Sequence, residues 1–344
     1  MVAMAFSTEE TLIGDLYQAA LKEPAASFQQ RALQMLGRSI GFDQAWWGIL
    51  SPNSHGFSLR SSFRHELPLA FEEHWKLVSA DDTLASDVHR APKTTIHYTP
   101  ADLSSTPGLK SLNGEQGIQH ALCTSIFLPG QDAFFFITLF RSGQYAQPFT
   151  PHAISLKQQL TSHIYLSWKA NLEAEIERMH IPNMLLKAST AFIDDTGLIL
   201  CADSAFADMF RELCPKWRTP DHIALNLLNS ASMSANGQFQ IRSSLAGGLQ
   251  RLDISRDLIF NRLTAREKEI ALLYADGKSY KDIAFDLALS PTTVRHYLRL
   301  IYAKAEITDK SELVRLSDEY SSMLTMKEMT GAAEKASEFL LSRM

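Results

Sequence analysis

The chain has little of what marks several large classes of protein. Its three cysteines, Cys123, Cys201 and Cys214, are an odd number without Cys-x-x-Cys spacing, which disfavours a disulfide framework and a zinc cluster. The longest apolar run, around residues 133–140, is too short to cross a membrane as a helix. The N-terminus lacks the basic start and apolar stretch of a signal peptide. We therefore expect a cytoplasmic protein with reduced thiols and no membrane partner.

Motifs for catalysis and cofactor binding are missing too. The sequence offers no convincing nucleophile–base arrangement, no phosphate-binding glycine loop and no His-Glu-x-x-His. His74, His89 and His97 lack the tight spacing of metal ligands, so we expect them to form hydrogen bonds at the surface or in the core. We expect no metal, no cofactor and no enzymatic activity.

Length and charge indicate a multi-domain globular protein that does not coat nucleic acid. The 344 residues are enough for two or three domains, and 45% hydrophobic with 21% charged residues is an ordinary globular composition. The net charge of −5 excludes binding DNA through bulk charge. Any DNA-binding surface must gather basic residues locally.

Residues 1–180 mix helix and strand patterns. Helical periodicity covers 8–21, 27–40 and 68–78, and strand patterns cover 45–50, stopped by Ser51-Pro52-Asn53, and 57–63. The clearest hairpin joins 122–128 to 133–140 through Pro129-Gly130, and a long helix follows from Pro151 until Pro182 breaks it. This order is typical of an α/β sandwich of the GAF or PAS kind.

Residues 183–255 predict a second, smaller unit. The stretch 191–210 resembles the opening of a PAS domain, with a strand, a tight turn at Asp195-Thr196-Gly197, a second strand and a short helix. Residues 239–243 and 249–254, split by Gly247-Gly248, predict a closing hairpin. The unit is short for a full PAS domain.

Residues 261–318 carry the signals of a helix-turn-helix. Thr264 and Glu267 form a capping-box pattern, and Gly277 ends the helix that they open. Ser279 caps a second helix, and Ser290 caps a third. Two capped helices joined by a short turn make a helix-turn-helix. A tail over 319–344 includes an amphipathic stretch from Glu334 to Leu341.

The third helix of this unit has an apolar stripe and a polar stripe, and no acidic residue lies between Ser290 and Ala305. A helix without acids in an acidic chain suits an element that enters the major groove among phosphates. Arginine can bind guanine bidentately, and histidine and threonine can contact base edges or phosphates. The polar stripe contains Thr292, Arg295, His296 and Arg299, and Lys304 extends the positive charge.

The unit resembles the LuxR-type, or GerE-type, DNA-binding domain over about 57 residues. The match includes Leu263, Thr264, Arg266, Glu267, Glu269, Gly277, Ser279, Ile283, Ala284, Leu287, Ser290, Thr293, Val294, Leu298, Ile301 and Lys304. Tyr297 and Ala305 depart from the histidine and leucine that are usual in the family, which puts the local packing in doubt.

This resemblance assigns roles to single residues. It implies that Arg295, His296 and Arg299 contact bases and that Thr293, Lys281 and Lys304 lie near the DNA backbone; we add Thr292 and Ser279 to the DNA-contacting set. It also implies a homodimer contact on the fourth helix, about 310–316, through Leu313, Val314 and Leu316.

The region ahead of Pro182 is expected to regulate DNA binding. It lacks the repeating strand–helix pattern of a phosphorylated receiver, but it is rich in aromatic residues, as a sensor pocket requires. Residues 67–98 have the general layout of an autoinducer-binding domain, which makes an acyl-homoserine lactone one candidate ligand. The expected ligand-binding residues are Trp47, Phe71, Trp75, Asp82, Tyr98 and Phe135.

The sequence thus predicts an α+β protein with a sensor at 1–180, a PAS-like unit at 183–255, a DNA-binding domain at 261–318 and a helical tail. The leading hypothesis is a transcriptional regulator, with promoter DNA, RNA polymerase, a small organic effector and a second copy of the chain as partners. The effector would shift the arrangement of the helix-turn-helix units in a dimer. The alternative is a constitutive or protein-regulated DNA-binding factor whose front half only dimerises.

Overall fold

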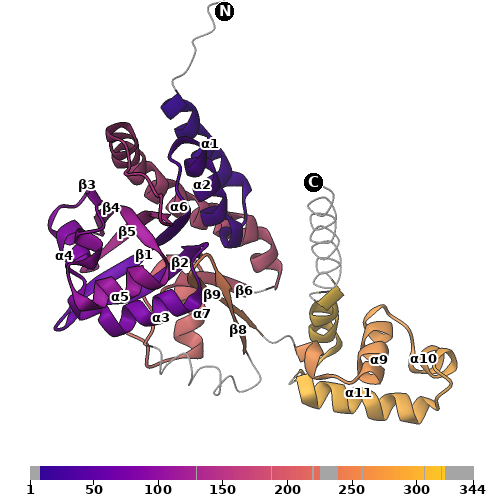
Figure 1. Ribbon diagram of the computed structural model, residues 1–344. Helices are drawn as coiled ribbons and strands as arrows, with labels where there is room; N and C mark the ends of the chain where they lie inside the picture. The colour runs from indigo at the N-terminus through magenta and orange to yellow at the C-terminus, as the bar shows by residue number, and fades with distance from the viewer. Residues whose placement is uncertain are drawn as a thin grey trace, which may run out of the picture.

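The computed structural model describes residues 8–128, 130–186, 188–218, 221–224, 239–256, 259–305, 307–318 and 320–321. Two antiparallel sheets are followed by a helical unit (Figure 1), which confirms the predicted α+β class. Most of the predicted tail, including 334–341, lies outside the described residues. Within the described residues, no helix combines the length and the apolar character that crossing a membrane requires.

The first sheet has five strands in the order β2-β1-β5-β4-β3, and each neighbouring pair is antiparallel. The strands are β1 (Gln44–Asn53), β2 (Gly56–His65), β3 (Thr95–Tyr98), β4 (Ile118–Leu128) and β5 (Ala133–Ser142). One face is covered by α1 (Thr8–Lys22), α2 (Ala25–Ser39) and α6 (Pro151–Leu186). The other is covered by α3 (Leu69–Val78), α4 (Thr83–Arg90) and α5 (Pro107–Glu115).

Strand β1 runs further than the sequence predicted, through Ser51 and Pro52 to Asn53. Its pairing with β5 ends at Leu50, and beyond that point only β2 pairs with it. Proline is tolerated on an edge strand because one side of the backbone needs no partner. Pro52 therefore ends the ladder on one side of β1 without ending the strand.

Alternation along β1 and β5 divides the aromatic side chains between two cores. Successive side chains on a strand point to opposite faces of the sheet, so residues adjacent in sequence lie in different cores. Trp47 and Phe135 pack under α6, where both rings contact Trp168. Trp46 and Phe136 pack edge to face beneath α3–α5, with ring centroids 4.9 Å apart.

A lysine lies inside the core under α6. Lys157 is fully buried, and its Nζ donates to Thr124 Oγ1 (2.6 Å) and to the carbonyl oxygen of Ile137 (2.8 Å). Burial lowers the pKa of Lys157 to about 7, because removing the ammonium from water disfavours its charged form. These bonds tie α6 to the middle of β4 and β5.

Helix α6 continues through Pro182 and ends at Leu186, so the predicted break at Pro182 is wrong. Proline removes one helical hydrogen bond, but its fixed φ is close to the helical value. This helix contacts strands of both sheets, and packing of that kind supplies most helical stability. The boundary expected between residues 180 and 183 falls inside α6.

The second sheet has the antiparallel order β7-β6-β9-β8. Its elements are β6 (Ala188–Ile193), β7 (Ile199–Ala202), α7 (Phe206–Leu213), β8 (Phe239–Ala246) and β9 (Leu249–Arg256). Phe192 and Leu249 on one face join the core under α6. The other face packs on α7. The predicted strand–turn–strand–helix order and the closing hairpin are both present.

Two tight contacts hold this second sheet against β2. The buried Arg60 guanidinium pairs with the buried Asp194 carboxylate, with Nε and Nη2 each 2.7 Å from Oδ2. At the β8–β9 turn, Gly248 has φ of +74°, and a Cβ there would lie 2.3 Å from the carbonyl oxygen of Ser62. Only glycine permits so close an approach in that conformation.

The C-terminal unit consists of α9 (Ala265–Ala275), α10 (Tyr280–Asp286), α11 (Pro291–Ala305) and a helix over 310–318. The predicted capping box of Thr264 with Glu267 is present, and the predicted Ser279 cap turns out to be a second capping box, with Asp282. Ser290 caps α11, where its Oγ accepts from the backbone N–H of Thr293 (3.0 Å).

The structure corrects the expected dimer contact on the last of these helices. Leu313 and Leu316 pack inside the core of their own domain, and Val314 is half-buried. A short amphipathic helix gives its apolar stripe to the nearest core, which here is its own domain. The exposed side chains of this helix belong instead to Ser311, Arg315 and Asp318.

Candidate DNA-binding and ligand-binding sites

Helix α11 is held in place by one buried stripe. Val294, Leu298 and Ile301 are buried against α9, α10 and the following helix. The turn that enters α11 is fixed by the backbone N–H of Leu289, which donates to the carbonyl oxygen of Ala284 (2.8 Å). The opposite side of α11 therefore faces solvent.

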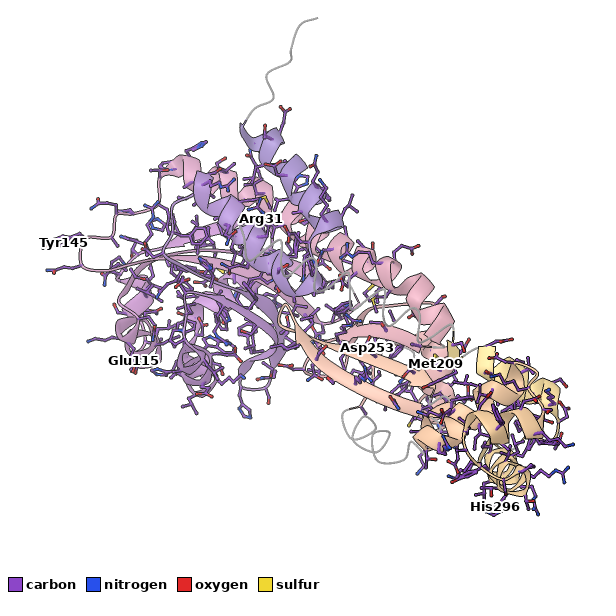
Figure 2. The ribbon with its side chains drawn as sticks, turned by 90° about the vertical axis from the view of Figure 1, so that its right-hand side faces the viewer. Arg31, Glu115, Tyr145, Met209, Asp253 and His296 are labelled. Carbon is purple, nitrogen blue, oxygen red and sulfur yellow. The ribbon has the colours of Figure 1, made fainter. Side chains whose placement is uncertain are left out.

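This outer side carries the residues that the sequence predicted. Thr292, Arg295, His296 and Arg299 are all exposed, and their spacing places them on one helical face. Figure 2 shows His296 at the outer end of the helical unit, away from the sheets. Thr293 is half-buried, and its hydroxyl lies 2.7 Å from the Ser290 hydroxyl.

Arg295 is oriented by an aromatic ring of the preceding helix. Its guanidinium carbon lies 5.2 Å from the centroid of the Tyr280 ring, within the range of a cation–π contact. Tyr280 in turn stacks on Tyr274, and the hydrogen bond between their hydroxyls raises the pKa of Tyr274 to about 12. A guanidinium held this way keeps its N–H edge available to a partner.

The remaining predicted DNA-contacting residues differ in their surroundings. Lys281 is exposed, whereas Ser279 Oγ donates to Asp282 within the α10 cap. Lys304 Nζ lies 2.7 and 2.8 Å from the two carboxylate oxygens of Glu267. Burial would raise the pKa of Glu267, but the hydrogen bond from Lys304 and those from Thr264 hold it below its usual value. Lys304 thus anchors α11 to the start of α9. A DNA contact by Lys281, Ser279 or Lys304 stays a prediction.

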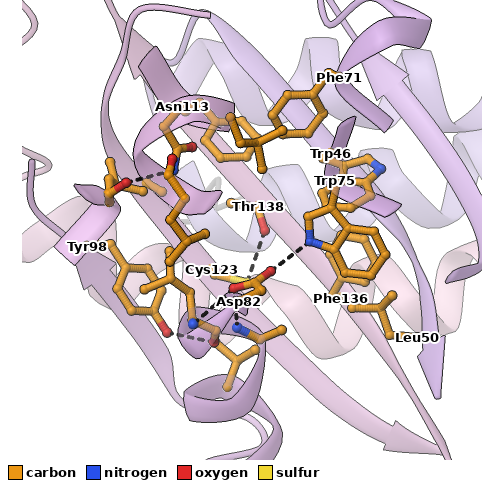
Figure 3. A pocket seen from close by; sticks show the side chains of 18 of the residues that line it. Trp46, Leu50, Phe71, Trp75, Asp82, Tyr98, Asn113, Cys123, Phe136 and Thr138 are labelled. Atoms are coloured by element: carbon orange, nitrogen blue, oxygen red, sulfur yellow. Dashed lines mark hydrogen bonds between the residues drawn. The ribbon is translucent and has the colours of Figure 1, made fainter. Parts of the chain in front are cut away.

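The first sheet holds a cavity on the side covered by α3–α5 (Figure 3). Its volume is about 60 Å³, room for roughly four to six water molecules at ~10–15 Å³ each. Most of the wall is apolar. It includes Trp46, Leu50, Phe71, Trp75, Tyr98, Phe134, Phe136 and Phe140.

Among the described residues of the cavity wall, Asp82 is the one carboxylate. Its Oδ2 accepts from Trp75 Nε1 (2.7 Å), and its Oδ1 accepts from the backbone N–H groups of Leu84 and Ala85 (3.0 Å each). Burial raises the pKa of Asp82 despite these three bonds. The last two bonds also make Asp82 the N-cap of α4.

Four further polar side chains line the cavity. Tyr98 Oη donates to the carbonyl oxygen of Leu84 (3.1 Å), and Asn113 Nδ2 donates to the carbonyl oxygens of Leu103 and Leu109. Thr138 Oγ1 donates to Cys123 Sγ (3.0 Å). Burial raises the pKa of the Cys123 thiol, which keeps it protonated. The cavity thus combines an apolar body with a few fixed polar groups, as small-molecule sites do.

The structure gathers four of the six residues that the sequence proposed for a ligand. Phe71, Trp75, Asp82 and Tyr98 line the cavity together. Trp47 and Phe135 do not, because strand alternation turns them into the core under α6. Their sequence neighbours Trp46, Phe134 and Phe136 line the cavity instead.

Sequence reasoning missed Asn113, Cys123 and Thr138. The strand pattern of β4 and β5 could have placed Cys123 and Thr138 on the face opposite Phe135, since the two residues pair across the strands. Asn113 carried no signal.

The three histidines considered as metal ligands each contact different residues. His74 Nδ1 lies 3.0 Å from Glu115 Oε2, His89 packs on Phe134, and His97 packs on His120. In the part of the chain that the structure describes, no three histidine, cysteine or acidic side chains are grouped as metal ligands would be.

Comparison with known proteins identifies the C-terminal unit. Residues 261–317 match the family of bacterial regulatory proteins called the luxR family, of GerE type. The transcriptional regulatory protein DesR of Bacillus subtilis is 44% identical over 59 residues, which are 17% of this chain and 30% of that protein. This unit is therefore a LuxR-family helix-turn-helix domain, and the chain spans less than a third of the length of the relatives it matches.

Solved structures resemble the N-terminal region at low identity. The N-acylhomoserine lactone dependent LuxR-family factor CepR2 of Burkholderia cenocepacia has a TM-score of 0.38 at 13% identity, over 49% of this chain and 98% of that one. The phycoerythrobilin-bound GAF domain of a cyanobacterial phytochrome has a TM-score of 0.33 at 11% identity, over 49% and 97%.

Proposed function

We propose that this protein is a DNA-binding transcriptional regulator that reads DNA with α11. The observation that carries the proposal is the exposed, acid-free face of α11 with Arg295, His296 and Arg299, in a domain that matches the luxR family. Arg295 and Arg299 would bind guanine edges, and His296 would contact a base or a phosphate. Thr292, Thr293, Lys281, Lys304 and Ser279 would contact the DNA backbone.

Arginine substitutions test the DNA contact. We expect Arg295→Ala and Arg299→Ala each to weaken binding of the full chain to DNA from its own control region by about 1–3 kcal/mol, or roughly 5- to 150-fold. Fluorescence anisotropy over a range of salt concentrations measures this. Arg315→Ala removes an exposed arginine from another helix of the same domain and should leave the affinity nearly unchanged. Wild-type affinity in both α11 variants would show that another surface reads the DNA.

We infer that a small organic effector occupies the cavity between the first sheet and α3–α5. A carboxylate has about four acceptor positions, and three donors already bind Asp82. The remaining position calls for an N–H or O–H donor on the ligand. None of the described residues that line the cavity is an arginine or a lysine, so an anionic ligand would face the Asp82 carboxylate without compensation. A neutral, mostly apolar molecule with one donor fits best.

Native mass spectrometry tests the effector. The full chain purified from its own host should carry a small molecule that is absent from an Ala85→Phe variant, since Ala85 lines the cavity and a phenyl ring there would fill it. The melting temperature of the variant shows whether it still folds. If both chains carry nothing, or the same molecule, the cavity is not the site, and a constitutive or protein-regulated factor becomes the better account.

The cavity and the DNA-binding unit would be coupled through the second sheet and a dimer. Arg60 and Asp194 tie β2 to the turn after β6, so a change in the first sheet would be passed on to the unit that precedes α9. The effector would then favour one dimer arrangement of the helix-turn-helix units by binding it more tightly. We propose units over 1–180, 183–255, 261–318 and 319–344, with α6 running across the first boundary. We also propose RNA polymerase as a partner and the cytoplasm as the location.

A further inference from the structure

A second cavity lies where the first sheet, α6 and the second sheet meet. Its volume is about 50 Å³, similar to that of the first cavity. Its walls come from three separate parts of the chain. Ile49 and Leu128 belong to the first sheet, Trp168 and Leu172 to α6, and Leu200 and Cys201 to β7.

Two polar side chains in this wall have buried atoms without a hydrogen-bond partner. They are Nε1 of Trp168, a donor, and Oε1 of Gln131, an acceptor. The Trp168 side chain is 1% exposed, so bulk water does not reach it. Buried polar atoms nearly always have partners, so a ligand that supplied one acceptor and one donor in this cavity would satisfy both atoms.

The mouth of the cavity carries balanced charge. Lys169 and Glu173 are exposed and lie four residues apart on α6, so they share one side of the helix. A cationic or an anionic occupant would meet one favourable and one unfavourable charge. The aromatic wall of Tyr165 and Trp168 favours a flat apolar body.

We propose that this cavity is a second ligand site, for a small uncharged molecule that carries a hydrogen-bond acceptor beside a donor on a flat apolar body, as a ring carboxamide does. Its carbonyl oxygen would accept from Trp168, and its N–H would donate to Gln131, after small movements of the two side chains. The occupant would touch both sheets and clamp the second sheet onto α6. The site is independent of the proposed DNA contact and of the first cavity.

Alkylation of Cys201 gives a direct readout with the full chain. Cys201 lines this cavity and is partly exposed, whereas Cys123 and Cys214 are buried. Burial raises the pKa of the Cys201 thiol to about 11, so alkylation is slow enough to follow by mass spectrometry of the labelled peptide. Benzamide is the probe, because it presents a carbonyl oxygen and an N–H donor on one ring. We expect benzamide to slow the alkylation of Cys201 in a saturable way.

Substitutions in the cavity wall test whether the protection comes from specific binding in this cavity. Trp168→Phe and Gln131→Met each remove one polar partner and should weaken the protection by about fivefold. Leu200→Trp fills the cavity and should abolish the protection. Because it removes no core side chain, it also serves as the test if the Trp168→Phe chain does not fold. Ala85→Phe, in the first cavity, should leave the protection intact. The proposal is overturned if the wild-type chain shows no saturable protection, or if the Gln131→Met and Leu200→Trp chains are protected as well as the wild type. Water would then be the occupant.

Discussion

Replacing Lys157 by methionine should remove a pH dependence of stability that the wild-type chain carries. The Lys157 side chain is fully buried beneath the first sheet, and its pKa is lowered to about 7 by burial. An unfolded lysine has a pKa of about 10.4. Between these two values the unfolded chain binds a proton at this position and the folded chain does not. The free energy of unfolding therefore rises with pH in this window.

The size of the effect follows from the difference of one bound proton. The slope approaches about 1.4 kcal/mol per pH unit, or about 3 kcal/mol over two units in the middle of the window. At pH values below about 7 both states bind the proton, and the slope disappears. Methionine keeps an unbranched side chain, one atom shorter, and loses the bonds to Thr124 and Ile137 at every pH. The difference in slope therefore isolates the ionisation.

Urea unfolding at a series of pH values, followed by tryptophan fluorescence, measures both slopes. Lys169→Met is the matched control, because Lys169 is an exposed lysine on the same helix and its removal should leave the wild-type slope in place. Parallel pH profiles for the wild-type and Lys157→Met chains would refute the reasoning. They would mean that Lys157 is hydrated and keeps an ordinary pKa in the folded chain.

Three further substitutions test the contacts that hold the units in shape. Arg60→Met leaves the buried Asp194 carboxylate without its cation and should cost about 3–5 kcal/mol of unfolding free energy; a loss under about 1 kcal/mol, the usual value of a surface pair, would contradict the assigned burial. Thr264→Ala removes the α9 cap and should destabilise the helical unit by about 1 kcal/mol, seen by circular dichroism, and an unchanged melting curve would argue against the cap. Gly248→Ala should destabilise more than Gly143→Ala in thermal unfolding, because both glycines have positive φ but only Gly248 is in close contact; equal losses would mean that the β8–β9 turn does not press on β2.

The sequence predicted most accurately where local signals decide the structure. The capping boxes at Thr264 and Ser279 are satisfied by residues three positions away, so a short stretch of sequence contains the whole interaction. The β4–β5 hairpin was equally clear from its strand patterns. The exposed face of α11 followed from helical spacing once the buried stripe was known.

The ligand site was harder because its residues meet only in three dimensions. The sequence implied that Trp46 and Trp47 face opposite sides, but not which side would hold the cavity. The side was decided by α3–α5, which cover Trp46, and by α6, which covers Trp47. The same limit hid the contacts of Lys157, whose partners lie 20 and 33 positions away.

Two mistakes have a common cause in tertiary packing. Pro182 was expected to end α6, but the helix continues to Leu186, and as a whole it contacts strands of both sheets. Leu313 was expected at a dimer surface, but its own domain buries it. In each case, packing against residues distant in sequence outweighed the local preference.

The central claim is that a molecule in the first cavity controls how α11 binds DNA. The most direct measurement is the affinity of the full chain for DNA from its control region, with and without the molecule that wild-type protein carries and the Ala85→Phe variant does not. We expect the molecule to change the wild-type affinity by about 5- to 150-fold, the usual range of coupling between sites, and to leave the Ala85→Phe affinity unchanged. Equal wild-type affinities with and without the molecule would contradict the account.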